Sequence, residues 1–313
     1  MSNAEIIGRK AIKITHIVVN IFVLIAILLL LAFGSYAIWD SNQVLSVADS
    51  ANYAIFRPSD EDEASFHELK AINPDVFAWL TVFGTNIDYP VVQGEHNMYY
   101  VSRDARGNHS LAGSIFLDAE SCQEFTDFSS ILYGHHMARG AMFGDIELFV
   151  DREFFDARRY GMLYFNGREH GLEFFAFLHT EAHNNAVFRV AIEGQDAQQA
   201  YLDTLMRMAI HTRDDVQVTT DDRIVLLSTC SEASTNGRDI LIGRITDEIF
   251  EDQFYTESPD RNIPVIDRLP DLWAQAPIWA RIGIISLPCL LALLLTVLIY
   301  KKRDKKKRSA IHK

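Results

Sequence analysis

Two long uncharged apolar segments lie near the two ends of the chain. The first covers residues 17–39 and the second covers residues 282–300. A helix of about 20 apolar residues crosses a hydrocarbon core roughly 30 Å thick. We therefore predict one membrane-spanning helix near each end.

The region after the first span is polar at first and then becomes regular. Residues 40–64 include an acidic run at 60–63, and we expect them to form a helical, acidic linker. Residues 65–72 place apolar side chains at 66, 69 and 72, which is helical spacing, and the Asn73–Pro74 pair ends the element. We predict a short amphipathic helix there, laid on a folded domain.

Beyond residue 76 the pattern changes to short β-branched and aromatic runs separated by Gly, Asn, Asp or Pro. We expect strands at residues 77–83, 87–92, 113–118, 129–134, 161–167, 171–180, 186–192, 223–229 and 239–245. Eight or nine such strands favour a mainly β fold, a closed or nearly closed β-barrel. Helical spacing predicts a helix at 196–208, and a short helix is expected at 140–149.

Basic residues indicate the orientation, because Lys and Arg beside spans stay on the cytoplasmic side. The tails 1–16 and 301–313 hold eleven of the 29 basic and two of the 42 acidic residues, which leaves a net charge of about −22 between them. We expect both termini to be cytoplasmic and the acidic domain to lie on the extracellular face of the cell membrane. Its charge repels phosphate, so nucleic acid is not an expected partner.

These observations predict seven consecutive regions. They are a cytoplasmic tail (1–16), a span (17–39), a linker (40–64), an exported domain (65–256), a proline-containing linker (257–281), a second span (282–300) and a basic cytoplasmic tail (301–313). Two alternatives stay open. The first span could be a cleaved signal peptide, and the second could be an apolar helix packed on the domain.

Three cysteines do not make a disulfide framework. Cys289 lies in the second span, which leaves Cys122 and Cys230 in the exported domain. A disulfide between these two is one alternative. The other is that a thiol in an oxidising compartment is kept for its reactivity.

The segment 223–245 carries the most informative chemistry. An apolar strand ends at Cys230, a small-polar loop follows, and a second apolar strand begins at Arg238. If the two strands pair as a hairpin, the guanidinium lies beside the sulfur, where it lowers the thiol pKa and donates to an oxyanion. Arg244 shares the face of Arg238 but lies about 20 Å along the strand. Taken separately, Cys230 could be a buried structural thiol and Arg238 a surface residue.

A second segment, 129–144, ends an apolar strand at Tyr133–Gly134 and continues with His135 and His136. An imidazole at a strand exit suits general acid/base chemistry near pH 7. Two histidines and a cysteine could also indicate zinc. Adjacent side chains diverge, however, and no spaced ligand pair accompanies them.

Together these motifs resemble the sortase family, and class B sortases most of all. The resemblance rests on Leu-Ser-Thr-Cys at 227–230, an Arg eight residues after the Cys, and Tyr-Gly-His-His-Met followed by Gly-Ala-Met-Phe-Gly. Residues 72–80, 84–94 and 113–118 and the predicted helix at 196–208 also look like parts of that class. The likeness extends over residues 65–249.

The resemblance implies an eight-stranded sortase β-barrel with peripheral helices, flanked by the two spans. It implies a cysteine transpeptidase that cleaves a C-terminal sorting signal of surface proteins after Thr and transfers the product to a peptidoglycan amine without a metal or organic cofactor. The implied roles are nucleophile for Cys230, acid/base for His135 and oxyanion stabiliser for Arg238. We expect Ser228, Thr229 and Ser231 to contact substrate.

One feature departs from class B. The second span with its basic tail resembles many pilin-polymerising class C sortases, whereas a single N-terminal anchor is usual in class B. A pilin lysine therefore stays open as the acceptor amine. A hydrolytic cysteine peptidase and a non-catalytic surface binding module are the other competing interpretations.

Overall fold

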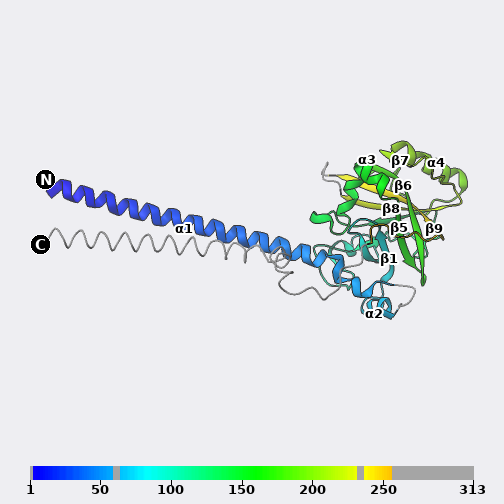
Figure 1. The fold of residues 1–313 in the computed structure, drawn as a ribbon, viewed down its shortest axis with the longest axis horizontal. Helices are drawn as coiled ribbons and strands as arrows, with labels where there is room; N and C mark the ends of the chain where they lie inside the picture. The colour runs from blue at the N-terminus through cyan, green and yellow to red at the C-terminus, as the bar shows by residue number, and fades with distance from the viewer. Residues whose placement is uncertain (1–2, 59–63, 231–235, 256–313) are drawn as a thin grey trace. The chain divides into compact units, whose positions relative to one another are not determined.

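The computed structural model describes residues 3–58, 64–230 and 236–255 (Figure 1). Residues Val44–Glu257 form one compact unit that holds every described strand, and the described residues before Val44 belong to a different unit. The predicted linker 257–281, the span 282–300 and the tail 301–313 lie outside the described residues.

The N-terminal helix α1 runs from Asn3 to Ala48 and contains the predicted first span. Its part from Val18 to Ala48 is long and apolar enough to cross a membrane, the one helix of this kind among the described residues. Both a membrane anchor and a signal sequence have this character.

The described residues of the unit Val44–Glu257 form nine strands with short helices between them. The strands are β1 (Val76–Val82), β2 (Asp88–Val92), β3 (Ile115–Leu117), β4 (Ser129–Tyr133), β5 (Tyr160–Phe165), β6 (Arg168–Glu181), β7 (His211–Thr212), β8 (Arg223–Cys230) and β9 (Gly237–Thr246). The α-helices are α2 (Ala64–Ile72), α3 (Arg152–Ala157) and α4 (Gln195–Met208). The 3-10 helices are η1 (Ser50–Asn52), η2 (Ala54–Phe56), η3 (Tyr100–Ser102), η4 (Ala138–Gly140) and η5 (Gly144–Val150).

The strands close into a barrel in the order β5-β1-β2-β3-β4-β8-β9-β6, because β6 pairs with β5 as well as with β9. The two-residue strand β7 is added to β6 outside this ring. Most neighbours are antiparallel, but β2 pairs with β3 and β4 with β8 in parallel. The predicted eight-stranded barrel is confirmed.

Two apolar clusters explain why strand β8 is apolar at almost every position. Val225 and Leu227 belong to the inner cluster, which fills the barrel. Leu226 belongs to the outer cluster, where helix α4 contributes Tyr201 and Leu205. Successive side chains of a strand point to opposite faces, so a strand buried on both sides carries an unbroken apolar run. In Figure 1, α4 lies beside β6 and β7.

Local signals located several elements correctly. The helices predicted at 65–72 and 196–208 are α2 and α4. The turn between β5 and β6 is Asn166–Gly167, with φ of 51° and 76°. Both residues must adopt positive φ in a tight hairpin turn of this kind, which Asn and Gly do with the smallest steric cost.

The strand predicted at 186–192 is wrong. These residues form turns and bends that lead into α4. Val187 and Ile192 are buried in the outer cluster, and the Tyr201 hydroxyl donates to the Val187 carbonyl at 2.6 Å. The apolar pattern therefore reflects burial beneath a helix, which looks the same as a strand in the sequence.

Two further segments differ from expectation. The helix expected at 140–149 is a 3-10 helix, η5, that begins at Gly144. The compact unit begins at Val44, so much of the expected linker packs with the barrel. Ala48, Tyr53 and Phe56 are buried in the inner cluster.

Candidate active site

The hairpin predicted around Cys230 is present. Cys230 is the last residue of β8, and Arg238 on β9 lies directly opposite it in the antiparallel register. A pair of facing residues in such a ladder has Cα atoms about 4.5–5.5 Å apart. The backbone therefore brings positions 230 and 238 together at one end of the barrel.

His135 reaches the same end from the other side of β8. Strands β4 and β8 are parallel, with Tyr133 opposite Ser228, and the Gly134 N–H donates to the Ser228 carbonyl at 3.2 Å. His135 follows directly. Since neighbouring strands lie about 4.8 Å apart, three adjacent strand ends carry the three candidate catalytic residues, with Cys230 on the middle one.

The ring of His135 is held by a backbone carbonyl. Its Nε2 lies 2.8 Å from the carbonyl oxygen of Val101. A carbonyl only accepts hydrogen bonds, so Nε2 must carry a proton, and in the neutral ring Nδ1 is the acceptor. The carbonyl of His135 in turn accepts the Phe143 N–H at 3.0 Å. Both the ring and the backbone of this residue are fixed.

Gly113 makes room for this arrangement. It has a φ of 62°, and a Cβ there would lie 2.7 Å from the Val101 carbonyl oxygen and 3.0 Å from Cδ2 of His135. Any larger residue would push on both the imidazole and the carbonyl that holds it.

The neighbouring histidine has a different partner. His136 Nε2 lies 2.9 Å from Oε2 of Glu147 in η5, and its side chain is largely buried. The two adjacent imidazoles therefore contact different groups, the Val101 carbonyl and the Glu147 carboxylate. Position 135, and not 136, lies next to the strand end that carries Cys230.

The guanidinium of Arg238 has few hydrogen-bond partners in the described part of the chain. Its one hydrogen bond within residues 3–58, 64–230 and 236–255 runs from Nη1 to the neighbouring Gly237 carbonyl at 2.9 Å. Burial raises the pKa of the Tyr133 hydroxyl, Asp118 adds to the rise, and the positive charge of Arg238 opposes it. Arg238 is thus within electrostatic range of the strand that leads to His135.

The candidate substrate-binding residues divide between the two faces of the sheet. Ser228 shares the face of Leu226, towards the outer cluster, whereas Thr229 shares the interior face of Leu227. Both hydroxyls are buried, and neither has a hydrogen-bond partner among the residues that the structure describes. Ser231 lies outside the described residues.

Sequence reasoning missed two contributions to this region. The carbonyl that holds His135 belongs to Val101, and a backbone group leaves no signal in residue identity. Phe188, from the segment mistaken for a strand, stacks on Tyr133 with ring centroids 6.5 Å apart. Cys122 is a free thiol, so it is not in the disulfide with Cys230 that the sequence left open.

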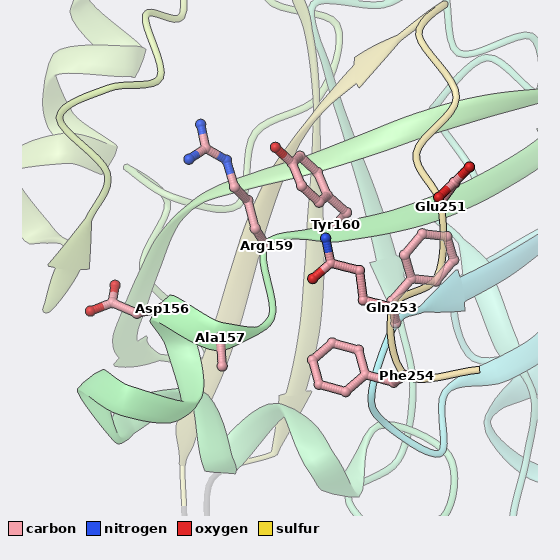
Figure 2. A pocket seen from close by; sticks show the side chains of 8 residues that line it. Asp156, Ala157, Arg159, Tyr160, Glu251, Gln253 and Phe254 are labelled. Atoms are coloured by element: carbon pink, nitrogen blue, oxygen red, sulfur yellow. The ribbon is translucent and has the colours of Figure 1, made fainter. Parts of the chain in front are cut away.

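A separate pocket of about 200 Å³ lies elsewhere on the domain (Figure 2). It is lined by residues of α3, the start of β5 and the segment 251–254, and none of its residues belongs to β4, β8 or β9. Its guanidinium, from Arg159, is paired with Glu173 and Asp215. This pocket is not part of the candidate active site.

Two curated relatives match the folded part of the chain. Sortase B of Staphylococcus aureus is 32% identical over 184 residues, which are 58% of this chain and 74% of that protein. Sortase B of Listeria monocytogenes is 32% identical over 180 residues, 57% of this chain and 72% of that protein. The chain belongs to the sortase family, in class B. As a sortase it is a cysteine transpeptidase.

Solved structures agree with this assignment, although no family model matches the chain. Sortase B from the type II pilus of Streptococcus pneumoniae is 46% identical, with a TM-score of 0.51, over 58% of this chain and 98% of that one. A class B sortase of Streptococcus pyogenes involved in pilus biogenesis is 37% identical, with a TM-score of 0.53, over 58% and 98% of the two chains. The barrel is therefore a sortase barrel.

Proposed function

We propose that this sortase joins surface proteins to an amine of the cell wall through a thioester on Cys230. The observation that carries the proposal is the set of three adjacent strand ends, with Cys230 between His135 and Arg238. Cysteine, imidazole and guanidinium supply the nucleophile, the proton carrier and the oxyanion donor that acyl transfer from a peptide requires.

In the first half-reaction the Cys230 thiolate attacks the carbonyl carbon of a threonine in the sorting signal. Arg238 donates to the oxyanion that forms. When the C–N bond breaks, the departing amine takes a proton from protonated His135, and a thioester remains. Because the Val101 carbonyl keeps the proton on Nε2, Nδ1 is the atom that exchanges protons with the amine.

In the second half-reaction the incoming amine loses a proton to Nδ1 of His135 and attacks the thioester. Collapse of the intermediate forms the new amide and expels the thiolate, so no net proton is gained or lost over the cycle. Ser228 and Ser231 are proposed to contact the sorting signal with their side chains. Thr229, on the interior face, is proposed to contribute through its backbone.

We propose that the acceptor amine belongs to a peptidoglycan precursor. A pilin lysine is the second candidate, and the specific observation in its favour is the 46% identity to a pilus sortase. The same chemistry serves both. We further propose that α1 and residues 282–300 anchor the enzyme with both termini cytoplasmic, which concentrates it with membrane-bound substrates.

The test uses the full chain in detergent micelles with threonine-containing pentapeptides and two amines, a peptidoglycan cross-bridge peptide and a lysine peptide. Mass spectrometry should detect a thioester on Cys230 and an amide product. C230A and H135A should give no product, while H136A, the matched control, should lose less than about tenfold. Equal cleavage without added amine would identify a hydrolase, and activity in C230A would refute the proposal.

A further inference from the structure

The end of α1 is fixed by side chains from the domain. The last carbonyls of a helix lack partners within the helix. Here the Asn52 side chain donates to the Ser46 carbonyl at 2.7 Å, and the Tyr89 hydroxyl donates to the Ala48 carbonyl at 2.8 Å. The segment that follows, residues 48–56, is anchored by Tyr53 and Phe56 in the inner cluster.

Tyr89 connects this segment to the loop after β4. Its hydroxyl also accepts the N–H of Met142 at 3.0 Å. Met142 pairs with His136 across the loop, and the next residue, Phe143, donates to the carbonyl of His135. One buried hydroxyl thus joins the end of α1 to the backbone that holds His135. Burial raises the pKa of Tyr89 to about 12, so the hydroxyl keeps the proton that it donates.

Arg106 makes a second, independent connection. Its Nη2 donates to the Asn52 carbonyl at 2.9 Å, and its guanidinium lies 4.9 Å from the ring centre of Tyr53 and 5.5 Å from that of Phe56. Arg106 belongs to the loop that follows η3, the 3-10 helix that contains Val101, and the Val101 carbonyl holds the ring of His135. The loops that contact the ring and the backbone of His135 are therefore both tied to the same nine-residue segment, residues 48–56.

We propose that residues 48–56 position the catalytic histidine, with Tyr89 and Arg106 as the positioning residues that transmit the contact. The proposal rests on the proposed function, in which His135 carries the proton. It makes the segment that leaves the membrane helix part of the catalytic apparatus. Without the contacts of this segment, the imidazole would lose its alignment.

The first test compares Y89F with Y201F in the full chain. Each change removes a buried, hydrogen-bonded hydroxyl, but Tyr201 lies in the outer cluster under α4. We expect Y89F to lower kcat about 10- to 100-fold with KM within about twofold, because a small misplacement of a catalytic group costs rate and not binding. Its pH profile of kcat should shift. Y201F should lower only stability.

The second test compares R106M with R152M, since Arg152 also lies over an aromatic ring, that of Phe155, at 5.8 Å. R106M should lower kcat with an altered pH profile, and R152M should not. R106K, which keeps the charge but not the planar guanidinium, should restore part of the loss.

A third measurement does not depend on activity. Nitrogen-15 NMR of labelled histidine reports the His135 tautomer, assigned by the signal that H135Q removes. The wild type should show a proton on Nε2, and Y89F and R106M a mixture of tautomers. Unchanged tautomer, kcat and pH profile in both variants would overturn the positioning role. An active H135A would instead overturn the proposed function, whatever the tautomer measurement shows.

Discussion

Two arginines on strand β9 share one face of the sheet but differ in their hydrogen-bond and ion-pair partners. Arg244 donates to Glu173 at 2.5 Å and to the Gln217 carbonyl at 3.0 Å, and Glu173 also accepts from Arg159 at 2.9 Å. Arg238, six positions earlier, has the Gly237 carbonyl as its one hydrogen-bond partner in the described part of the chain. Among the described residues, Arg244 has a carboxylate partner and Arg238 has none.

The difference is consistent with a structural role for Arg244 and with the oxyanion-stabilising role proposed for Arg238. Glu173 is buried, and it is paired with Arg244 across the β6–β9 ladder, so this ion pair fastens two strands of the barrel. An arginine with a committed carboxylate partner has few donors left for a substrate. The role proposed for Arg238 requires available donors, because they would bind the charge that develops only during the reaction.

The largest expected effect is that of R238M on catalysis. Removing an oxyanion donor typically costs about 10²–10³-fold in rate. We expect kcat/KM to fall by this factor, measured with a sorting peptide and an amine, while the free energy of unfolding changes by less than about 0.5 kcal/mol. R238K should recover only part of the rate, because lysine lacks the planar fork of donors. A fully active R238M would remove the distinction between the two arginines.

The opposite outcome is expected for R244M. Glu173 would lose one of its two cationic partners, and a hydrogen bond between charged groups contributes about 1.5–3 kcal/mol. Denaturant unfolding should show a loss of about that size, with kcat/KM of the folded enzyme within about threefold of the wild type. The double variant E173Q/R244M should lose less than the sum of the single changes. Additive losses would mean that the ion pair does not stabilise the barrel.

The smallest expected effect is a loss of stability in acid, and it concerns His170, near the start of β6. Its ring is buried, stacks on Phe165 at 4.0 Å and lies 3.4 Å from Asp247. Burial lowers the pKa of His170, and Arg168 and Arg223 lower it further. The folded state thus favours the neutral ring, whereas the unfolded chain takes up a proton below a pH of about 6.5.

The contribution of His170 to the free energy of unfolding should therefore be constant above a pH of about 6.5 and should fall as the pH drops below that value. The check is the difference in Tm between pH 7.5 and pH 5.5, which should be smaller in H170Q than in the wild type. An equal difference in both proteins would assign the acid sensitivity to another group. Since Asp247 lies nearby and raises the pKa of His170, D247N should enlarge the difference.

Local sequence signals predicted the centre of the site well. The hairpin places Cys230 opposite Arg238 as expected, because a strand, a short polar loop and a second strand allow little choice of register. The Asn166–Gly167 turn and helix α4 followed from local chemistry in the same way.

Contacts between distant segments could not be predicted from the residues alone. That His135 lies next to Cys230 depends on the parallel pairing of β4 with β8, which no local pattern encodes, and only the family resemblance suggested it. The Val101 carbonyl and the Tyr89 hydroxyl take their roles from tertiary structure. The strand prediction at 186–192 was wrong because an apolar pattern does not distinguish burial in a strand from burial outside one.

The parallel pairing of β4 with β8 also determines when the proposed catalytic residues can come together. Parallel neighbours cannot be joined by a tight turn, and here the crossover contains β5, β6, α4 and β7. Such distant contacts form late and slowly during folding, whereas the β5–β6 and β8–β9 hairpins can form early. Positions 135 and 230 thus come together only after nearly the whole domain has been synthesised and folded, so a nascent or truncated chain would lack the arrangement proposed for catalysis.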